Sequence, residues 1–207
     1  MNNEREFRSF DLIKRSEDTE GLEYIVEGYA STFERYVLFR DEDTETDYSE
    51  QISPSAFDEA DFGDCVFRVD HEGPVYARTS AGTIQIDIDE KGLHTVTDLS
   101  KTARARALHE DIVAGNYPQM SFAFTVAEDH YDRSTHTRII DRIAKVFDIA
   151  AVTWPANPTT SLSARSKDFF DGVIEEEKVE RLELERRTKA LERLNKLLKK
   201  EADENDS

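Results

Sequence analysis

The sequence contains little that could cross-link the chain, span a membrane or bind nucleic acid. Only one of its 207 residues is a cysteine, Cys65, which excludes an intramolecular disulfide. No apolar run reaches membrane-spanning length, and residues 1–16 lack the pattern of a signal peptide. We therefore expect a reducing, cytoplasmic setting and no membrane partner.

Basic residues are also scarce. The chain has 27 Lys and Arg against 45 Asp and Glu, a formal net charge of −18. Residues 168–207 hold 13 acidic and 9 basic side chains, so most of the negative charge belongs to the rest of the chain. A body this acidic repels phosphates, and the nearest approach to a basic patch is Lys101 with Arg104 and Arg106. We expect no nucleic-acid partner.

What remains is a charged chain with enough apolar residues, 38%, to build a core. Its patterns predict an α+β protein that is mainly β. We divide it into a polar, irregular N-terminal segment at 1–20, a globular domain at 21–167, and a charged amphipathic helix with an acidic tail at 168–207.

The clearest local pattern is a hairpin. Residues 83–89 (TIQIDID) alternate strictly between apolar and polar, and a turn with Gly92 leads into a second strand at 93–99. Ser100 or Thr102 then caps a helix that runs to about Ala114.

Other segments are predicted from composition. Residues 120–127 and 137–143 form a second hairpin, and 146–154 is a separate strand buried on both faces. Residues 40–50 (RDEDTETDYSE) read as an acidic loop with too little apolar material to pack, and 53–57 as a short helix.

The C-terminal segment carries a leucine stripe. Leu184, Leu191 and Leu198 are seven residues apart, with Leu194 between them, in a stretch otherwise dominated by charges. The pattern predicts one long helix that forms a coiled coil with a copy or a partner, or else packs on its own domain.

Three segments each place one chemically capable side chain beside a strand-like run. They are 69–72 (VDHE), 119–124 (QMSFAF) and 147–154 (FDIAAVTW), which carry His71, Ser121 and Asp148. A serine hydroxyl becomes nucleophilic at neutral pH when an imidazole accepts its proton, and a carboxylate orients that imidazole. These residues are 50 and 27 positions apart, so only the fold can bring them together.

In that order, these segments resemble the prohead (capsid maturation) serine proteases of tailed phages, the HK97-like family. The histidine context, the segment 120–124 (MSFAF) and the late 155–158 (PANP) match the family pattern. Further matches are 27–33 (EGYASTF), 52–57 (ISPSAF) and 89–93 (DEKGL), so the resemblance spans roughly residues 24–165.

The resemblance implies a fold similar to the herpesvirus assemblins, a β-barrel core with surrounding helices. It implies a serine endopeptidase with His71, Ser121 and Asp148 as catalytic residues and no cofactor or metal. The substrates would be the major capsid protein or a scaffold protein, inside assembling proheads in the host cytoplasm, and the protease would also cleave itself.

The chain departs from the family pattern at two positions. Asp148 stands where the family has glutamate, so its carboxylate reaches His71 only if the backbone compensates, and Asp70 or Glu72 could orient the imidazole instead. Ala123 replaces a frequent glycine. A catalytically silent capsid scaffold protein with the same fold is therefore the main alternative. An unrelated β-rich binding module is another. The C-terminal helix could join copies of the chain into a homo-oligomer.

The remaining candidates have ordinary explanations. Cys65 lies in an apolar run and reads as a buried small hydrophobe more readily than as a thiol nucleophile. Arg78 could shape an oxyanion site or be a surface cation. The other histidines read as surface residues; they are His94, His109, His130 and His136. His130 and His136 lie near Asp129 and Asp132 in the sequence, and these four side chains could bind a metal in principle.

Overall fold

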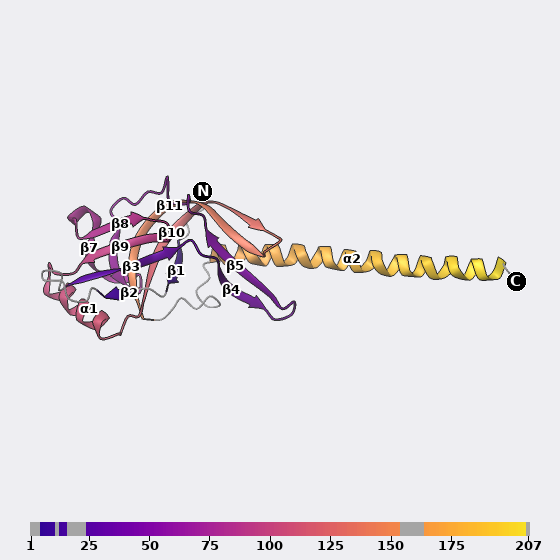
Figure 1. Cartoon of the computed structure of the whole chain (residues 1–207), viewed down its shortest axis with the longest axis horizontal. Coiled ribbons are helices and arrows are strands. Elements are labelled where there is room, and N and C mark those ends of the chain that lie inside the picture. Colours follow the sequence, from indigo (N-terminus) through magenta and orange to yellow (C-terminus); the bar gives the residue numbers. More distant parts are fainter. Residues whose placement is uncertain (1–4, 11–12, 16–23, 154–163, 206–207) are drawn as a thin grey trace. The chain divides into compact units, whose positions relative to one another are not determined.

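The computed structural model describes residues 5–10, 13–15, 24–153 and 164–205, and it divides the chain into two compact units, 1–163 and 164–207 (Figure 1). The elements in chain order are β1 (Glu6–Phe10), β2 (Ile13–Arg15), β3 (Ile25–Thr32), β4 (Tyr36–Asp41), β5 (Thr46–Ile52), β6 (Val66–Val69), β7 (Glu72–Arg78), the 3-10 helix η1 (Thr79–Ala81), β8 (Ile84–Ile88), β9 (Gly92–Asp98), α1 (Ala103–Val113), β10 (Gln119–Asp132), β11 (Thr137–Val152) and α2 (Ala164–Asn205).

The first unit contains two sheets. The larger has seven strands in the order β1-β10-β11-β5-β4, with β6 and β7 branching from β11. The smaller has four strands in the order β2-β3-β9-β8. Strand residues outnumber helical residues in the part of the chain that the structure describes, which agrees with a mainly β, α+β class.

The expected β-barrel core with surrounding helices is not found in this topology. Among the described residues no sheet closes on itself, and α1 and the short η1 are the helices found in the first unit. The larger sheet forks because the two halves of β11 pair with different strands: Thr137–Ile140 runs parallel to β5, and Asp148–Ala151 runs parallel to β6. A likeness to the assemblin fold is not confirmed.

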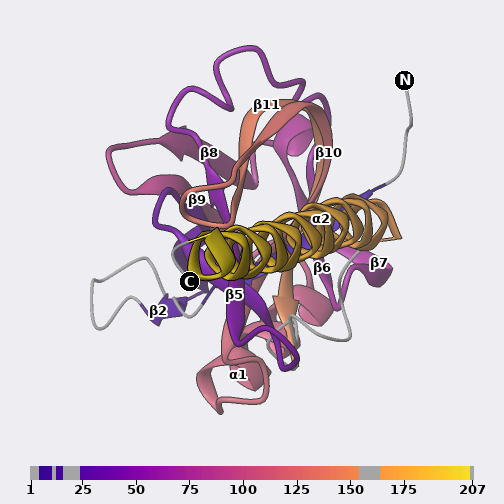
Figure 2. The same ribbon diagram turned by 90° about the vertical axis from the view of Figure 1, so that its right-hand side faces the viewer.

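The hairpin of β10 and β11 is the longest among the described residues, and it curves along its length (Figure 2). The two stretches predicted as separate strands, 137–143 and 146–154, are one strand up to Val152. Its register against β10 shifts four times, and Asp141, Ala144 and Phe147 of β11 have no partner in the ladder. Extra residues of this kind are β-bulges, which bend a strand and increase its twist.

Several predicted elements are confirmed. β8 and β9 form the expected antiparallel hairpin, and Gly92 at its turn has no room for a side chain, because a Cβ would lie 2.1 Å from the Ser31 carbonyl oxygen. The hydroxyl of Thr102 accepts a hydrogen bond from the Ala105 amide and caps α1. The leucine-striped segment is a single helix, α2, although it begins at Ala164 rather than 168.

Three predictions are wrong. The acidic loop at 40–50 is largely strand, because β4 ends at Asp41 and β5 begins at Thr46. Residues 53–57 form successive turns instead of a helix, with backbone bonds such as Ala56 N–H to the Ser53 carbonyl. The N-terminal segment, expected to be irregular, contributes β1 and β2.

One core cluster draws on both sheets and on α1. Phe122 and Phe124 stack with ring centroids 4.4 Å apart, and they are buried with Phe67, Ile149 and Leu108. The apolar residues around Ser121 and Asp148 therefore anchor β10 and β11, the strands that carry those two side chains, in the hydrophobic core. None of the described helices is long and apolar enough to cross a membrane.

Candidate active site

His71 lies at the tip of a tight hairpin between β6 and β7. Val69 pairs with Glu72, which leaves Asp70 and His71 as a two-residue turn, and both have positive φ angles, +46° and +60°. Two successive left-handed residues define the turn that matches the twist of a hairpin, a position usually filled by Asn, Asp or Gly. His71 follows the predicted strand, as expected. Its positive φ angle is an unusual backbone conformation for this residue type.

Contacts to the end of β11 hold this turn in place. The Asp70 amide donates to the Ala151 carbonyl over 3.0 Å. The Asp70 carboxylate accepts hydrogen bonds from the Thr153 amide (2.9 Å) and the Thr153 hydroxyl (2.7 Å). The Asp70 carboxylate is thus bound by Thr153, and the carboxylate that contacts the imidazole is that of Asp148.

Ser121 lies on β10 with its side chain fully buried. It is flanked by Ser9 of β1 on one side and Ala150 of β11 on the other. Its Oγ lies 2.7 Å from Nε2 of His71 and also 2.7 Å from the backbone carbonyl oxygen of Arg8, to which the hydroxyl donates.

Asp148 completes the arrangement from β11. Its Oδ1 lies 2.5 Å from Nδ1 of His71, and the side chains of His71 and Asp148 are 13% and 4% exposed. The shorter side chain reaches the imidazole because Asp148 pairs with Val66 of β6, the strand that leads into the histidine turn. The fold therefore brings together all three residues that the sequence singled out.

A chain of contacts from carboxylate to imidazole to hydroxyl has a defined chemical capacity. Nε2 of His71 is placed to accept the Ser121 proton as the hydroxyl attacks a carbonyl carbon. A carboxylate placed like that of Asp148 can fix the tautomer with a proton on Nδ1 and stabilise the imidazolium that forms. Burial of the serine and the carboxylate strengthens these interactions, because charges and dipoles are screened less in the protein interior than in water.

The alternative nucleophile, Cys65, is unsuited to the role. Burial and the nearby charges of Asp148 and Asp64 raise the pKa of its thiol to about 12. A thiol reacts as the thiolate, which such a pKa suppresses at neutral pH. Cys65 is a buried small side chain, as its apolar context indicated.

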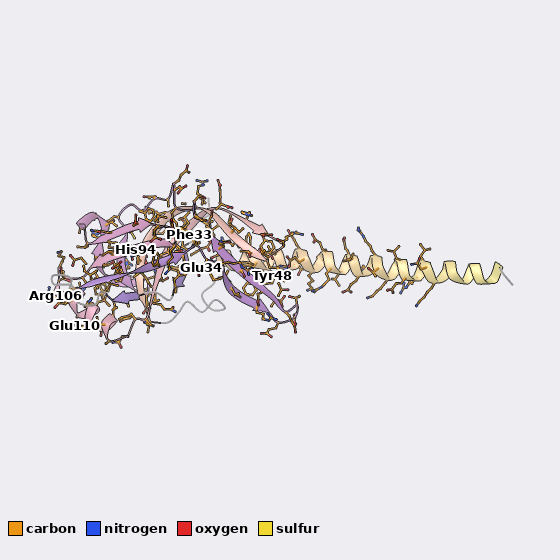
Figure 3. All side chains as sticks on the ribbon, in the orientation of Figure 1. Phe33, Glu34, Tyr48, His94, Arg106 and Glu110 are labelled. Atoms are coloured by element: carbon orange, nitrogen blue, oxygen red, sulfur yellow. The ribbon has the colours of Figure 1, made fainter. Side chains whose placement is uncertain are left out.

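The remaining sequence candidates lie in other contacts. The Arg78 guanidinium is 2.7 Å from Asp64 at the surface, and no described contact joins it to Ser121. Glu72 is exposed at the start of β7. Nε2 of His94, on β9 (Figure 3), lies 3.0 Å from Glu27.

The histidines near the hairpin tip contact neighbouring side chains. Nδ1 of His130 lies 2.5 Å from Asp141, and Nδ1 of His136 lies 3.0 Å from the Tyr131 hydroxyl. Burial lowers the pKa of His109, which packs against Tyr24. In the part of the chain that the structure describes, no three metal-ligating side chains gather in one place.

Sequence reasoning missed the N-terminal strand that lies against the site. The Phe7 ring packs on the His71 ring with centroids 4.6 Å apart, and the Arg8 carbonyl contacts Ser121. Segment 6–10 (EFRSF) does alternate between charged and apolar residues at its start, but the charged side chains lie on the buried face. A search for strands with apolar residues on the buried face therefore does not find it.

Those charges belong to a buried cluster on the opposite face of β1 from Phe7. Arg8 binds Glu50 through two hydrogen bonds of 2.5 and 2.7 Å and binds Glu6 at 2.8 Å. Arg138 binds Glu6, Glu50 and Asp129 at 2.6 to 3.0 Å, and its side chain is fully buried. Burial opposes the charge on Arg8, but Glu50 and the other neighbours outweigh it, so the pKa of Arg8 is raised well above its usual value.

A serine, an imidazole and a carboxylate joined in this way define the class of activated-serine hydrolases. The comparison with known families agrees: a family model described as caudovirus prohead serine protease matches residues 10–171. The chain belongs to this family of serine peptidases. No curated protein and no solved structure matches it.

Proposed function

We propose that the protein is a serine endopeptidase in which Ser121 is the nucleophile, His71 the general base and then acid, and Asp148 the residue that orients the imidazole. The observation that carries this proposal is that one imidazole contacts both the Ser121 hydroxyl and the Asp148 carboxylate, at 2.7 and 2.5 Å, in a chain of a serine peptidase family.

The reaction follows from these positions. Ser121 Oγ attacks the carbonyl carbon of a peptide bond while Nε2 of His71 takes its proton, giving an acyl-enzyme once His71 returns that proton to the leaving amine. A water molecule, deprotonated by the same imidazole, then releases the acyl group and restores Ser121.

The substrates that fit a prohead protease are capsid-associated proteins. We propose that the enzyme cleaves the major capsid protein or its scaffold within assembling proheads in the host cytoplasm, and that it also cleaves its own chain. The family membership supports the first statement, and a long charged helix following a complete domain offers a segment for the second.

An intact-mass time course of the full chain and its Ser121→Ala variant tests the activity. The parent should shorten at discrete sites, alone or when co-expressed with its capsid protein, and the variant should stay full length. If parent and variant give the same products, Ser121 is not the nucleophile. If neither shortens and the capsid protein also stays intact, the catalytically silent scaffold is the better description.

A further inference from the structure

The proposed nucleophile is covered by the chain itself. β1 pairs antiparallel with β10 over five residues, and Ser9 stands directly opposite Ser121, which has no exposed surface. A peptide substrate has to bring its carbonyl carbon to within roughly 3 Å of the serine oxygen. With β1 in this position, the edge of β10 beside Ser121 is already taken.

The contact between Arg8 and Ser121 also opposes catalysis. A hydroxyl has one hydrogen to donate, and a backbone carbonyl can only accept. Nε2 of His71 and the Arg8 carbonyl oxygen both lie 2.7 Å from Oγ of Ser121. A hydrogen donated to Arg8 is not available to the imidazole, so the base cannot activate the serine while this bond is in place.

The two faces of β1 hold it by different means. On the face toward the site, Phe7 packs against the ring of His71. On the other face, the Arg8 guanidinium reaches Glu50 of β5 and Glu6 of its own strand. At Phe7 and Arg8 the strand therefore makes directional contacts to the imidazole and to the charge cluster, while Phe10 at its end packs against the hydrophobic core.

Contacts of this kind suit a strand that can leave. A buried ion pair gains little net stability, because desolvation of the charges offsets their attraction. Glu6 and Arg8 leave together as a neutral pair, and Arg138 then stays beside Glu50 and Asp129 as their counter-ion. Departure of β1 thus exposes the edge of β10, and the carboxylates that remain in the cluster keep Arg138 as a cation.

We propose that β1 is an inhibitory strand in the substrate's place: substrate binds as an extended peptide pairing antiparallel with β10, and it does so only after residues 6–10 are displaced. This inference rests on the proposed function of Ser121. An exposed strand edge recognises a peptide through its main chain, as β1 does now. The family match begins at residue 10, so β1 precedes the matched region almost entirely.

A reversible disulfide between β1 and β10 tests the proposal in the full chain. Phe7 and Ala123 are direct cross-strand partners. The distance between directly opposed residues allows two cysteines to form a disulfide, so we choose Phe7→Cys with Ala123→Cys. The native Cys65 is buried and does not compete. The readouts are modification of Ser121 by a fluorophosphonate, followed by intact mass, and hydrolysis of a peptide.

The reduced protein should react at least tenfold faster than the oxidised protein, and adding reductant to the oxidised sample should restore the rate. Phe7→Cys alone, treated with the same oxidant, is the matched control and should be insensitive to it. Equal rates in the oxidised and reduced double variant would overturn the proposal, because the serine would then be reached with β1 in place.

A second variant separates this inference from the function on which it rests. Phe7→Ala removes the packing on His71 and leaves the three site residues and the charge cluster intact, so Ser121 should be modified several times faster than in the parent. If parent, Phe7→Ala and reduced double variant are all folded and all unreactive, the proposed activity fails. If Ser121 reacts equally fast in parent and Phe7→Ala, and oxidation has no effect, only the inhibitory strand fails.

Discussion

Asp70 and His71 adopt a backbone conformation that costs each of them on the order of 1–3 kcal/mol. Such strain persists where surrounding contacts enforce it, and the bonds from Thr153 to Asp70 supply that enforcement. The result is an imidazole whose position is fixed by its own turn, independently of the loop flexibility that usually accompanies a surface histidine.

The role of Asp148 can be tested without changing its shape. Asp148→Asn keeps the volume but favours the wrong imidazole tautomer and removes the charge that stabilises the imidazolium, so kcat should fall about 10⁴-fold. Steady-state hydrolysis of a peptide substrate measures it, with circular dichroism to show that the fold is retained.

Asp70→Asn is the matched control, because Asp70 is the neighbouring carboxylate but bonds Thr153 and not the imidazole. We expect its kcat to fall less than tenfold. A larger loss in Asp70→Asn than in Asp148→Asn would assign the orienting role to Asp70.

At the level of single residues, the sequence indicated the three site residues but not the residues that surround them. His71, Ser121 and Asp148 each lie in or beside a short apolar segment, and the order of these segments along the chain made them recognisable through their resemblance to a known family. The Arg8 carbonyl and the Phe7 ring are contacts between segments more than 60 residues apart, so only the three-dimensional structure reveals them.

Among the elements, β5 shows why composition misled. Its segment was judged too polar to pack, yet Tyr48, Ser49 and Glu50 are buried. Glu50 accepts hydrogen bonds from Arg8, Arg138 and the Tyr36 hydroxyl, so its charge is matched inside the sheet. α1 and the β8–β9 hairpin were predictable because their caps and alternation are local, whereas the partners of Glu50 come from three other strands.

Although a buried ion pair adds little net stability, removing one of the cations from the charge cluster should destabilise the larger sheet strongly. Arg138→Leu leaves Glu6, Glu50 and Asp129 with one cation fewer in a buried site, and it should lower the free energy of unfolding by about 3–5 kcal/mol. Urea unfolding followed by fluorescence measures the change.

Arg142→Leu is the control on the same strand, because Arg142 forms its ion pairs with Glu128 and Glu59 at the surface. Exposed pairs contribute little, so its unfolding midpoint should stay close to that of the parent. Equal destabilisation in the two variants would contradict the importance assigned to burial.

Helix α2 presents its leucine stripe to solvent within its own unit. Leu184, Leu191 and Leu194 are 66%, 60% and 51% exposed. We predict that this stripe mediates association through helix–helix packing, so the double change Leu184→Glu with Leu191→Glu should reduce the mass measured by sedimentation to that of a monomer.

Peptide hydrolysis by the same variant should match the parent, because the site residues all belong to the first unit. Lys189→Glu, which alters a charged position of the helix, serves as the control and should keep the parent's mass. An unchanged mass in the leucine variant would show that the helix does not hold copies together.

For the molecule as a whole, the net charge of −18 governs how partners approach. An acidic body attracts basic peptides over distances of about 10 Å at 0.1 M salt, and screening shortens that range. We expect kcat/KM for a peptide with flanking lysines to fall severalfold between about 20 mM and 500 mM salt.

The same peptide with flanking glutamines should show little salt dependence, because it carries no charge for the protein's field to act on. Equal salt sensitivity of the two peptides would point to an effect on the enzyme instead, for example on the charge cluster beneath β1.

Because of the bulges in β11, the geometry of the site depends on the number of residues in this strand. Successive residues of a strand point to opposite faces, and each unpaired residue inverts that order for everything beyond it. Phe147 is such a residue immediately before Asp148. Deletion of this single phenylalanine would turn the carboxylate to the far side of the sheet. Insertions and deletions within 141–147 should therefore be selected against even where the individual side chains are free to vary, whereas the turn at 133–136 can change in length.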